Sequence, residues 1–318
     1  MMAPKKRIMW LLPMKKVLYA LFPAALASVY FYGWRAFILI AVTVSAAYIS
    51  EYLFARHYDE PVNSSVFVTG LLLAMTLPPS LPFWMAAVGA VFGVVFGKMV
   101  FGGFGKNPFN PALVGRAFIY ITFAQHMTSR WYVPANGLFG GFSKYTPDAV
   151  TAATFLKTST VVDNSWYLHA AIGNISGSLG ETSAILLFLG GIYLFWKKIA
   201  NRSIVISTFL GMVGMQGIFW LLGVRTTVNP LAAFLSGGFV LGMFFMATDP
   251  VSAPKQNESK ILYGLFIGIM TVLIRVFSVW PEGMMFAILL GNTFAPITDY
   301  GISQYKLSRK AKALKGDI

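Results

Sequence analysis

The prolines that decide the fold lie in the stretch Thr76-Leu77-Pro78-Pro79-Ser80-Leu81-Pro82. Proline has no amide donor and its ring clashes with the preceding helical turn, so these residues cannot continue a helix. The apolar runs on either side, 64–79 and 83–100, are each close to the length that crosses a bilayer. The stretch therefore predicts two membrane-spanning helices separated by a break.

The composition predicts a membrane protein along the whole chain. Of the 318 residues, 57% are hydrophobic and 11% are charged, whereas soluble domains carry about 25% charged residues. We expect an all-α polytopic membrane protein with about ten transmembrane helices. The expected spans are 17–32, 36–54, 64–79, 83–100, 110–125, 183–196, 203–222, 230–247, 261–279 and 283–298.

The net charge of +14 is explained by membrane topology. With the amino terminus in the cytoplasm, 19 of the 25 Lys and Arg residues fall on the cytoplasmic side, as the positive-inside rule requires. The other six are Arg35, Arg130, Lys144, Lys157, Arg225 and Arg275. We therefore expect no nucleic-acid partner, a place in the inner (cytoplasmic) membrane with both termini in the cytoplasm, and residues 126–182 as a long loop on the outer face.

The first break has a counterpart in the second half, Thr248-Asp249-Pro250-Val251-Ser252-Ala253-Pro254. Each break lies between two spans, and a further polar interruption follows at 107–111 or 291–292. The matching spans are the third and the eighth, and this odd offset places the two copies in opposite orientations. The alternative is that membrane segments rich in Gly and Pro merely look alike.

The repeat predicts the domain organisation. Two inverted five-helix halves, 1–125 and 183–300, are joined by the outer loop 126–182. A basic cytoplasmic tail, 301–318, follows them. We expect its basic residues, Lys306 to Lys315, to contact anionic lipid, with partner docking as the second interpretation.

Helix breaks are candidate sites, because backbone groups without helical partners must face protein, water or a ligand inside a membrane. Between 102 and 118, the amides of Asn107 and Asn110 suit the polar edge of a flavin, although helix caps explain them equally well. Lys106 lies beside them, and Arg116 near a span end requires an acid, a phosphate or a carbonyl as partner.

Two carboxylates at expected cytoplasmic span ends, Asp249 and Asp299, are candidate members of an ion path. Asp249 is equally compatible with a helix cap. The chain has no cysteine, which excludes disulfides and cysteine-ligated clusters within it. The three histidines are scattered, so we expect no metal site and regard an organic cofactor as the main redox option.

The outer loop contains the heptad Asp148-Ala149-Val150-Thr151-Ala152-Ala153-Thr154. An exposed hydroxyl can be esterified by the phosphate of FMN when a transferase presents FAD and releases AMP. Ala152 and Ala153 are small neighbours that allow this approach, and Asp148 and Thr151 offer polar contacts. The alternative is a turn in which Asp148 or Thr151 caps a short helix.

The sequence resembles the family of RnfD and NqrB, membrane subunits of the Rnf ferredoxin:NAD oxidoreductase and of the sodium-pumping NADH:quinone oxidoreductase. The resemblance covers nearly the whole chain, in the segments Thr76–Pro79, Phe104–Phe118, Ala247–Pro254 and Glu282–Asn292. The family's flavinylation pattern, Asp-x-x-(Ser/Thr)-Gly-Ala-(Thr/Ser), corresponds to 148–154, with Ala152 in place of the usual Gly. The resemblance implies covalent FMN on Thr154 and a second flavin, riboflavin, near Asn107 and Asn110.

The resemblance also implies a function. The short amino-terminal extension fits RnfD better than NqrB, so we expect the RnfD-type member of an Rnf complex, which couples electron flow to Na+ or H+ translocation and is not active alone. Its expected partners are the other Rnf-type subunits, membrane lipid and, during maturation, the flavin transferase. The alternatives are NqrB, a cofactor-free channel or secondary transporter with the same repeat, and a passive membrane anchor for redox partners.

Overall fold

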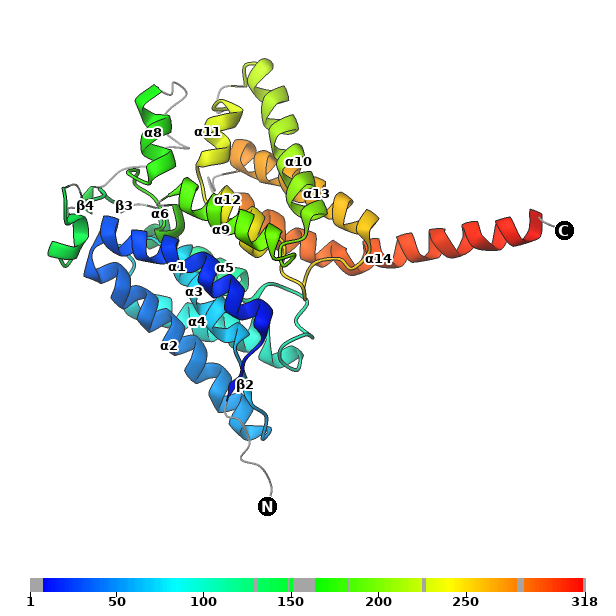
Figure 1. Cartoon of the computed structure of the whole chain (residues 1–318), viewed down its shortest axis with the longest axis horizontal. Helices are drawn as coiled ribbons and strands as arrows, with labels where there is room; N and C mark the ends of the chain where they lie inside the picture. Colours follow the sequence, from blue (N-terminus) through cyan, green and yellow to red (C-terminus); the bar gives the residue numbers. More distant parts are fainter. Residues whose placement is uncertain are drawn as a thin grey trace.

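The computed structural model describes residues 8–128, 131–135, 137–147, 149–150, 164–181, 183–224, 227–278 and 283–316. Helices make up most of these residues, which confirms the predicted all-α polytopic class (Figure 1). Five helical segments are long and apolar enough to cross a membrane. They are α1 (Leu12–Tyr32), α2 (Trp34–His57), α4 (Phe83–Gly97) with its 3-10 extension η1 (Met99–Phe101), α10 (Arg202–Leu221) and α13 (Asn257–Phe277).

Shorter helices and one very long helix complete the described membrane region. Three apolar helices are too short to span alone, namely α3 (Ser65–Met75), α5 (Pro111–Thr122) and α9 (Ala184–Trp196). The last helix, α14, runs from Gly283 to Gly316 without interruption. The basic tail predicted over 301–318 is therefore, as far as Gly316, the continuation of this helix, and it projects away from the other helices (Figure 1).

The two halves of the chain form two packed groups (Figure 1). In the first half α2 packs against α3 and α4, and α4 packs against α5. In the second half α13 packs against both α10 and α14. The groups meet where α1 packs against α9, the first helices of the two halves. The predicted pair of inverted five-helix repeats stays a prediction.

The predicted single span over 230–247 is wrong, because the structure divides it into three pieces. These are α11 (Pro230–Leu235), α12 (Phe239–Leu241) and the π-helix η4 (Gly242–Met246). Gly237 and Gly238 interrupt the helix with φ values of 65° and 62°. This left-handed conformation suits glycine and is unfavourable for residues with a Cβ.

Two arginines bind the backbone exposed by helix breaks. After α3, Arg35 donates from Nε to Pro79 O (2.9 Å) and from Nη2 to Ser80 O (3.2 Å) and Leu81 O (3.0 Å). After α11, Arg275 donates to the carbonyl oxygens of Ala233 (2.8 Å), Ser236 (3.0 Å) and Gly237 (3.1 Å). Each guanidinium thus provides donors for carbonyls that have lost their helical partners, as the interior of a membrane requires.

The segment between the halves lies at one side of the molecule, which we call the loop side. Its elements are α6 (Ala124–Thr128), β3 (Trp131–Tyr132), η2 (Gly140–Ser143), β4 (Ala149–Val150), α8 (Asn164–Ile172) and η3 (Leu179–Glu181). Strands β3 and β4 are antiparallel, with Trp131 opposite Val150. The segment reaches the ends of two helices, since Leu179 N donates to Leu77 O (3.0 Å) and Tyr32 Oη donates to Ile175 O (3.1 Å).

The other end of the helix assembly carries a second short strand pair. Strand β1 (Ile8–Met9) is parallel to β2 (Val62–Asn63), directly before α1 and α3. Beyond it, the N–H of Leu11 donates to Ser64 Oγ (3.0 Å). The beginning of the described chain is therefore fixed against the start of α3, opposite the loop side.

Candidate functional site

A cavity of about 70 Å³ lies between the two halves, opposite the loop side. Its walls come from the beginnings of α1 and α3, the ends of α4 and α9, the π-helix η4 and the breaks that follow α4 and η4. Its polar lining residues are Ser65, Thr69, Lys98, Asn107, Asn110, Thr248 and Asp249. The rest of the lining is apolar, and a space of this volume with some polar groups in its wall is large enough for several water molecules.

Two asparagines join the breaks of the two halves beside this cavity. Asn110 caps α5, since its Oδ1 accepts from Ala112 N (3.0 Å), and its Nδ2 donates to Met246 O (3.4 Å) at the end of η4. The N–H of Asn110 donates to Asn292 Oδ1 (3.4 Å). Asn292, on α14, donates in turn from Nδ2 to Ser252 O (3.2 Å) and Tyr263 Oη (2.8 Å). Asn110 therefore acts as a cap and as a connection between halves.

A buried ion pair lies at the first-half side of the cavity, where its lysine, Lys98, is part of the wall. Lys98 Nζ donates to Glu51 Oε2 (2.6 Å) and to Ser65 Oγ (2.8 Å). The other oxygen of Glu51 accepts from Asn63 N (3.1 Å). Lys98 is 1% exposed and Glu51 is 3% exposed. Charges buried this deeply require hydrogen-bonding or charged partners. The pair connects α2, β2, α3 and the end of α4.

Asp249 lies in the opposite wall, in the break after η4. Its Oδ1 accepts from Val251 N (3.2 Å) and its Oδ2 accepts from Ser252 Oγ (3.0 Å). The carboxylate thus stabilises the turn of the break; it does not cap a helix, the alternative weighed from the sequence, because the next helix, α13, begins only at Asn257. It also supplies a second charged group to the cavity that Lys98 lines.

Three other predicted residues lie outside the cavity lining, and two of them come from the 102–118 segment. Lys106 is exposed in the turn before Asn107. Arg116 is buried within α5, nearer the loop side, where its charge interacts with Glu181 and Tyr120. The structure therefore brings Asn107, Asn110 and Asp249 together and separates Lys106 and Arg116 from them.

Asp299, the third of these residues, binds the beginning of α13. Its Oδ2 accepts from Lys255 N (2.8 Å) and its Oδ1 from Gln256 N (3.1 Å). Partial burial would raise the pKa of Asp299, but the backbone donors and Ser259 together hold this pKa below its ordinary value. A carboxylate at a helix amino terminus is a stabilising arrangement. Asp299 therefore connects α14 to the beginning of α13 through these hydrogen bonds.

The flavinylation motif is only partly described. Ala149 and Val150 form β4, whereas Asp148, Thr151, Ala152, Ala153 and Thr154 lie outside the described residues. The predictions for these five residues therefore rest on the sequence. The described part of the motif belongs to the loop segment, in the β3–β4 pair.

The cavity is too small for the riboflavin that was predicted near Asn107 and Asn110. The amides and the Lys98 ammonium suit the polar edge of a flavin. However, the cavity measures about 70 Å³, and an apolar cavity of roughly 150 Å³ is what accommodates benzene. The three-ring isoalloxazine does not fit in this cavity as it stands, so we derive no step through riboflavin.

Sequence reasoning missed Lys98, Glu51 and Asn292 as members of the site. Lys98 was assigned only to the cytoplasmic charge, and Glu51 lies 47 residues away along the chain. No local sequence pattern predicts their pairing. For Asn292 a signal existed, since the predicted repeat matches Gly291-Asn292 with Asn107–Pro111, and the structure places Asn292 against Asn110.

The sequence matches the NQR2, RnfD, RnfE family over residues 6–308. The B subunit of the Na(+)-translocating NADH-quinone reductase of Ectopseudomonas mendocina (strain ymp) is 43% identical over 278 residues, which cover 85% of this chain and 67% of the relative. The protein of the same name from Neisseria meningitidis serogroup B is 40% identical over 273 residues, covering 84% and 66%. The chain spans about two thirds of the length of these curated relatives. Helical architecture and sequence agree, and the chain belongs to the NQR2, RnfD, RnfE family.

Proposed function

We propose that the chain is the flavin-bearing membrane subunit of an ion-translocating NADH–quinone oxidoreductase, which acts together with partner subunits of that complex. The observation that carries the proposal is the 43% identity to the B subunit of a Na(+)-translocating NADH-quinone reductase over 85% of this chain. The names of the similar proteins thus favour the quinone-reductase interpretation over the Rnf interpretation, which the short amino-terminal extension had suggested. The Rnf complex remains the second candidate.

The electron acceptor distinguishes the two candidates. The complex that contains this chain, purified from its host and reduced with NADH, should reduce a quinone. A complex that instead exchanges electrons between ferredoxin and NAD, and is inactive with quinone, would support the Rnf interpretation and contradict ours. The presence of flavin on this chain does not distinguish them, because the attachment pattern is common to both resembled subunits.

The proposed cofactor attachment uses Thr154, through a phosphoester to FMN. When bound, FMN transfers one or two electrons. Thr154 lies four residues beyond Val150, and an extended chain of four residues covers at most about 14 Å. The described residues of the same motif, Ala149 and Val150, form β4 on the loop side. A covalent bond here retains the cofactor and keeps its local concentration high.

Flavin fluorescence in denaturing gels tests this attachment. The chain produced in its host, with the transferase present, should give a fluorescent band. Thr154→Ala should abolish the fluorescence, whereas Thr146→Ala, a matched control two residues before the motif, should retain it. A Thr154→Ala band as bright as wild type would show that another residue carries the flavin.

The cavity between the halves is the proposed part of the ion path. Asp249 lines it, and Asp299 is the second proposed member, at the beginning of α13. In membrane proteins, buried carboxylates at breaks between repeats commonly serve ions. Asp249→Asn keeps the size of the side chain and should lower ion transport per electron in proteoliposomes that contain the complex. Unchanged ion transport per electron in Asp249→Asn would exclude this carboxylate.

A further inference from the structure

The loop segment is fastened to the corner between α1 and α2 by five hydrogen bonds. All join residues 135–145 to residues 30–35. They are Ala135 N to Phe31 O (2.7 Å), Tyr30 Oη to Gly137 O (2.8 Å), Trp34 Nε1 to Phe142 O (2.9 Å), Trp34 N to Lys144 O (3.2 Å) and Arg35 N to Tyr145 O (2.9 Å). This part of the loop is therefore held in a defined position against two spanning helices.

Two glycines make the contact close. A Cβ on Gly140 would lie 2.7 Å from the Tyr30 ring, and a Cβ on Gly141 would lie 2.5 Å from the backbone nitrogen of Gly33. Real Cβ atoms do not approach other atoms this closely, so a side chain at either position would push the segment away from the corner. The sequence Gly140-Gly141 thus allows the loop backbone to rest directly on the helix corner.

This fixed segment exposes large apolar side chains. Leu138 is 89% exposed, Phe139 69% and Phe142 40%. The adjacent Trp34 and Phe37, at the beginning of α2, are 47% and 52% exposed. Exposed apolar side chains that gather in one place mark a surface that contacts a membrane or a protein. We call these five residues the corner patch.

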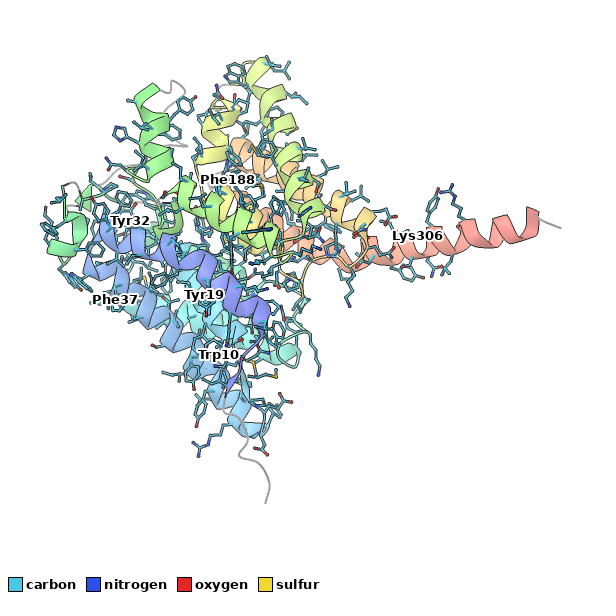
Figure 2. All side chains as sticks on the ribbon, viewed as in Figure 1. Trp10, Tyr19, Tyr32, Phe37, Phe188 and Lys306 are labelled. Carbon is cyan, nitrogen blue, oxygen red and sulfur yellow. The ribbon has the colours of Figure 1, made fainter. Side chains whose placement is uncertain are left out.

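The corner patch continues the lipid-facing surface of α2. The ring of Trp34 contacts the ring of Phe37 (6.0 Å between centroids), and Trp34 also binds the backbone of Phe142. Phe37 lies on the outward flank of α2, a short way from the corner marked by Tyr32 (Figure 2). It is three residues into a membrane-spanning helix, about 4.5 Å along the axis from Trp34.

We propose that residues 137–142 dip into the lipid leaflet on the loop side, with Leu138 and Phe139 in contact with acyl chains. The occupant of the corner patch is lipid, because the patch is continuous with the exposed apolar face of α2, a helix long and apolar enough to cross a membrane. Its flanks suit the same position, since Lys144 and Tyr145 are exposed next to it, and Trp, Tyr and Lys collect at the membrane–water interface. The proposal does not depend on the flavin.

The position of the corner between α1 and α2 also determines where the next described segment, β4, starts. The described strand β4 begins four residues after Tyr145, so the segment that follows the corner starts at the membrane surface.

Depth-dependent fluorescence quenching tests the proposal; this chain has no native cysteine, and the complex without an introduced cysteine, labelled in parallel, gives the background from partner subunits. We would label Leu138→Cys with an environment-sensitive fluorophore, in the assembled complex reconstituted into phosphatidylcholine vesicles. Phe37→Cys is the matched lipid-facing control, and Lys144→Cys is the control for the aqueous flank. The quenchers are phosphatidylcholine brominated on its acyl chains and aqueous iodide.

The proposal predicts that brominated lipid quenches the Leu138 probe to the same extent as the Phe37 probe, and that iodide quenches it far less than the Lys144 probe. Phe139→Cys should behave as Leu138→Cys does, which guards against a local distortion by one label. Efficient iodide quenching at position 138 would overturn the proposal in favour of a solvated loop. Protection from both quenchers would also overturn it, because a protein partner would then cover the corner patch.

Discussion

At the scale of single residues, the most consequential feature is the pair formed by Lys98 and Glu51. The ammonium has two partners, Glu51 Oε2 at 2.6 Å and Ser65 Oγ at 2.8 Å. The second carboxylate oxygen has the N–H of Asn63. Burying two charges is favourable only when their mutual attraction and their hydrogen bonds offset the loss of hydration. The geometry meets both conditions.

Removing one member of this pair should therefore harm the protein more than removing both. Lys98→Met leaves the Glu51 carboxylate buried without its cation, and we expect a loss of about 3–5 kcal/mol in the free energy of unfolding. The double variant Lys98→Met/Glu51→Gln should recover much of this loss. Equilibrium unfolding in detergent measures both values. Additive losses in the double variant would contradict the coupling.

The exposed ion pair of Lys306 and Glu258 contrasts with this buried pair. Lys306 Nζ donates to Glu258 Oε2 at 2.7 Å, but both side chains are about half exposed, and Figure 2 shows Lys306 on the projecting part of α14. Exposed ion pairs contribute little to stability, because water and salt screen the charges. The two ion pairs have similar N···O distances. Their different burial therefore explains their different contributions to stability.

At the scale of elements, close helix packing depends on glycine. Along α4, the glycines at 89, 93 and 97 all face α5. A Cβ on Gly93 would lie 2.5 Å from Pro111 O and 3.0 Å from the Cα of Gly115. Small residues at such spacing let membrane helices approach each other closely. The α4–α5 contact positions Asn110 at the cavity, since Asn110 directly precedes α5.

A matched pair of substitutions tests this packing. Gly93→Ala inserts a methyl group where none fits, and overpacking of this kind costs about 1–3 kcal/mol. Gly214→Ala, in α10, adds the same group where no atom lies within 4 Å. It should be neutral or stabilise by up to about 1 kcal/mol, because alanine favours the helix. Equal stabilities of the two variants in detergent would argue against the α4–α5 contact.

The elements also show what the sequence predicts well and what it does not. Prolines ended α3 near the expected position, because proline acts locally and without regard to tertiary context. The break at Ser236–Gly238 was missed, since glycine permits a helix as well as an interruption, and its backbone carbonyls are stabilised by Arg275 from another helix. The continuous helix α14 was missed because a basic surface is equally typical of a tail and of a solvated helix.

At the scale of the whole molecule, the two halves meet at a polar cavity. The polar residues of the 102–118 segment were predicted as a site, and the structure brings two of them, Asn107 and Asn110, to this cavity with Asp249. The contribution of Lys98 and Glu51 was not predictable, because it depends on helices that meet only in the folded chain. The loop heptad was predicted from the sequence, and Thr154, its predicted attachment residue, lies outside the described residues.

The orientation in the membrane is a prediction at this scale. The distribution of Lys and Arg predicts that the loop side faces outward and that the end of α14 is cytoplasmic. In sealed right-side-out vesicles, a membrane-impermeant maleimide should label Lys144→Cys at once and Ser308→Cys only after lysis. Cysteine at these two exposed positions is a unique target, because the chain has none of its own. The reverse labelling pattern would invert the topology.

The proposed function of the whole molecule depends on a covalent flavin on Thr154. Its most direct test is the intact mass of the chain purified from its host, followed by mapping of the modified peptide. We predict a mass greater than the sequence mass by one FMN less one water, lost with Thr154→Ala and located on the peptide that contains 148–154. An unmodified wild-type chain, from a host with an active flavin transferase, would contradict the account.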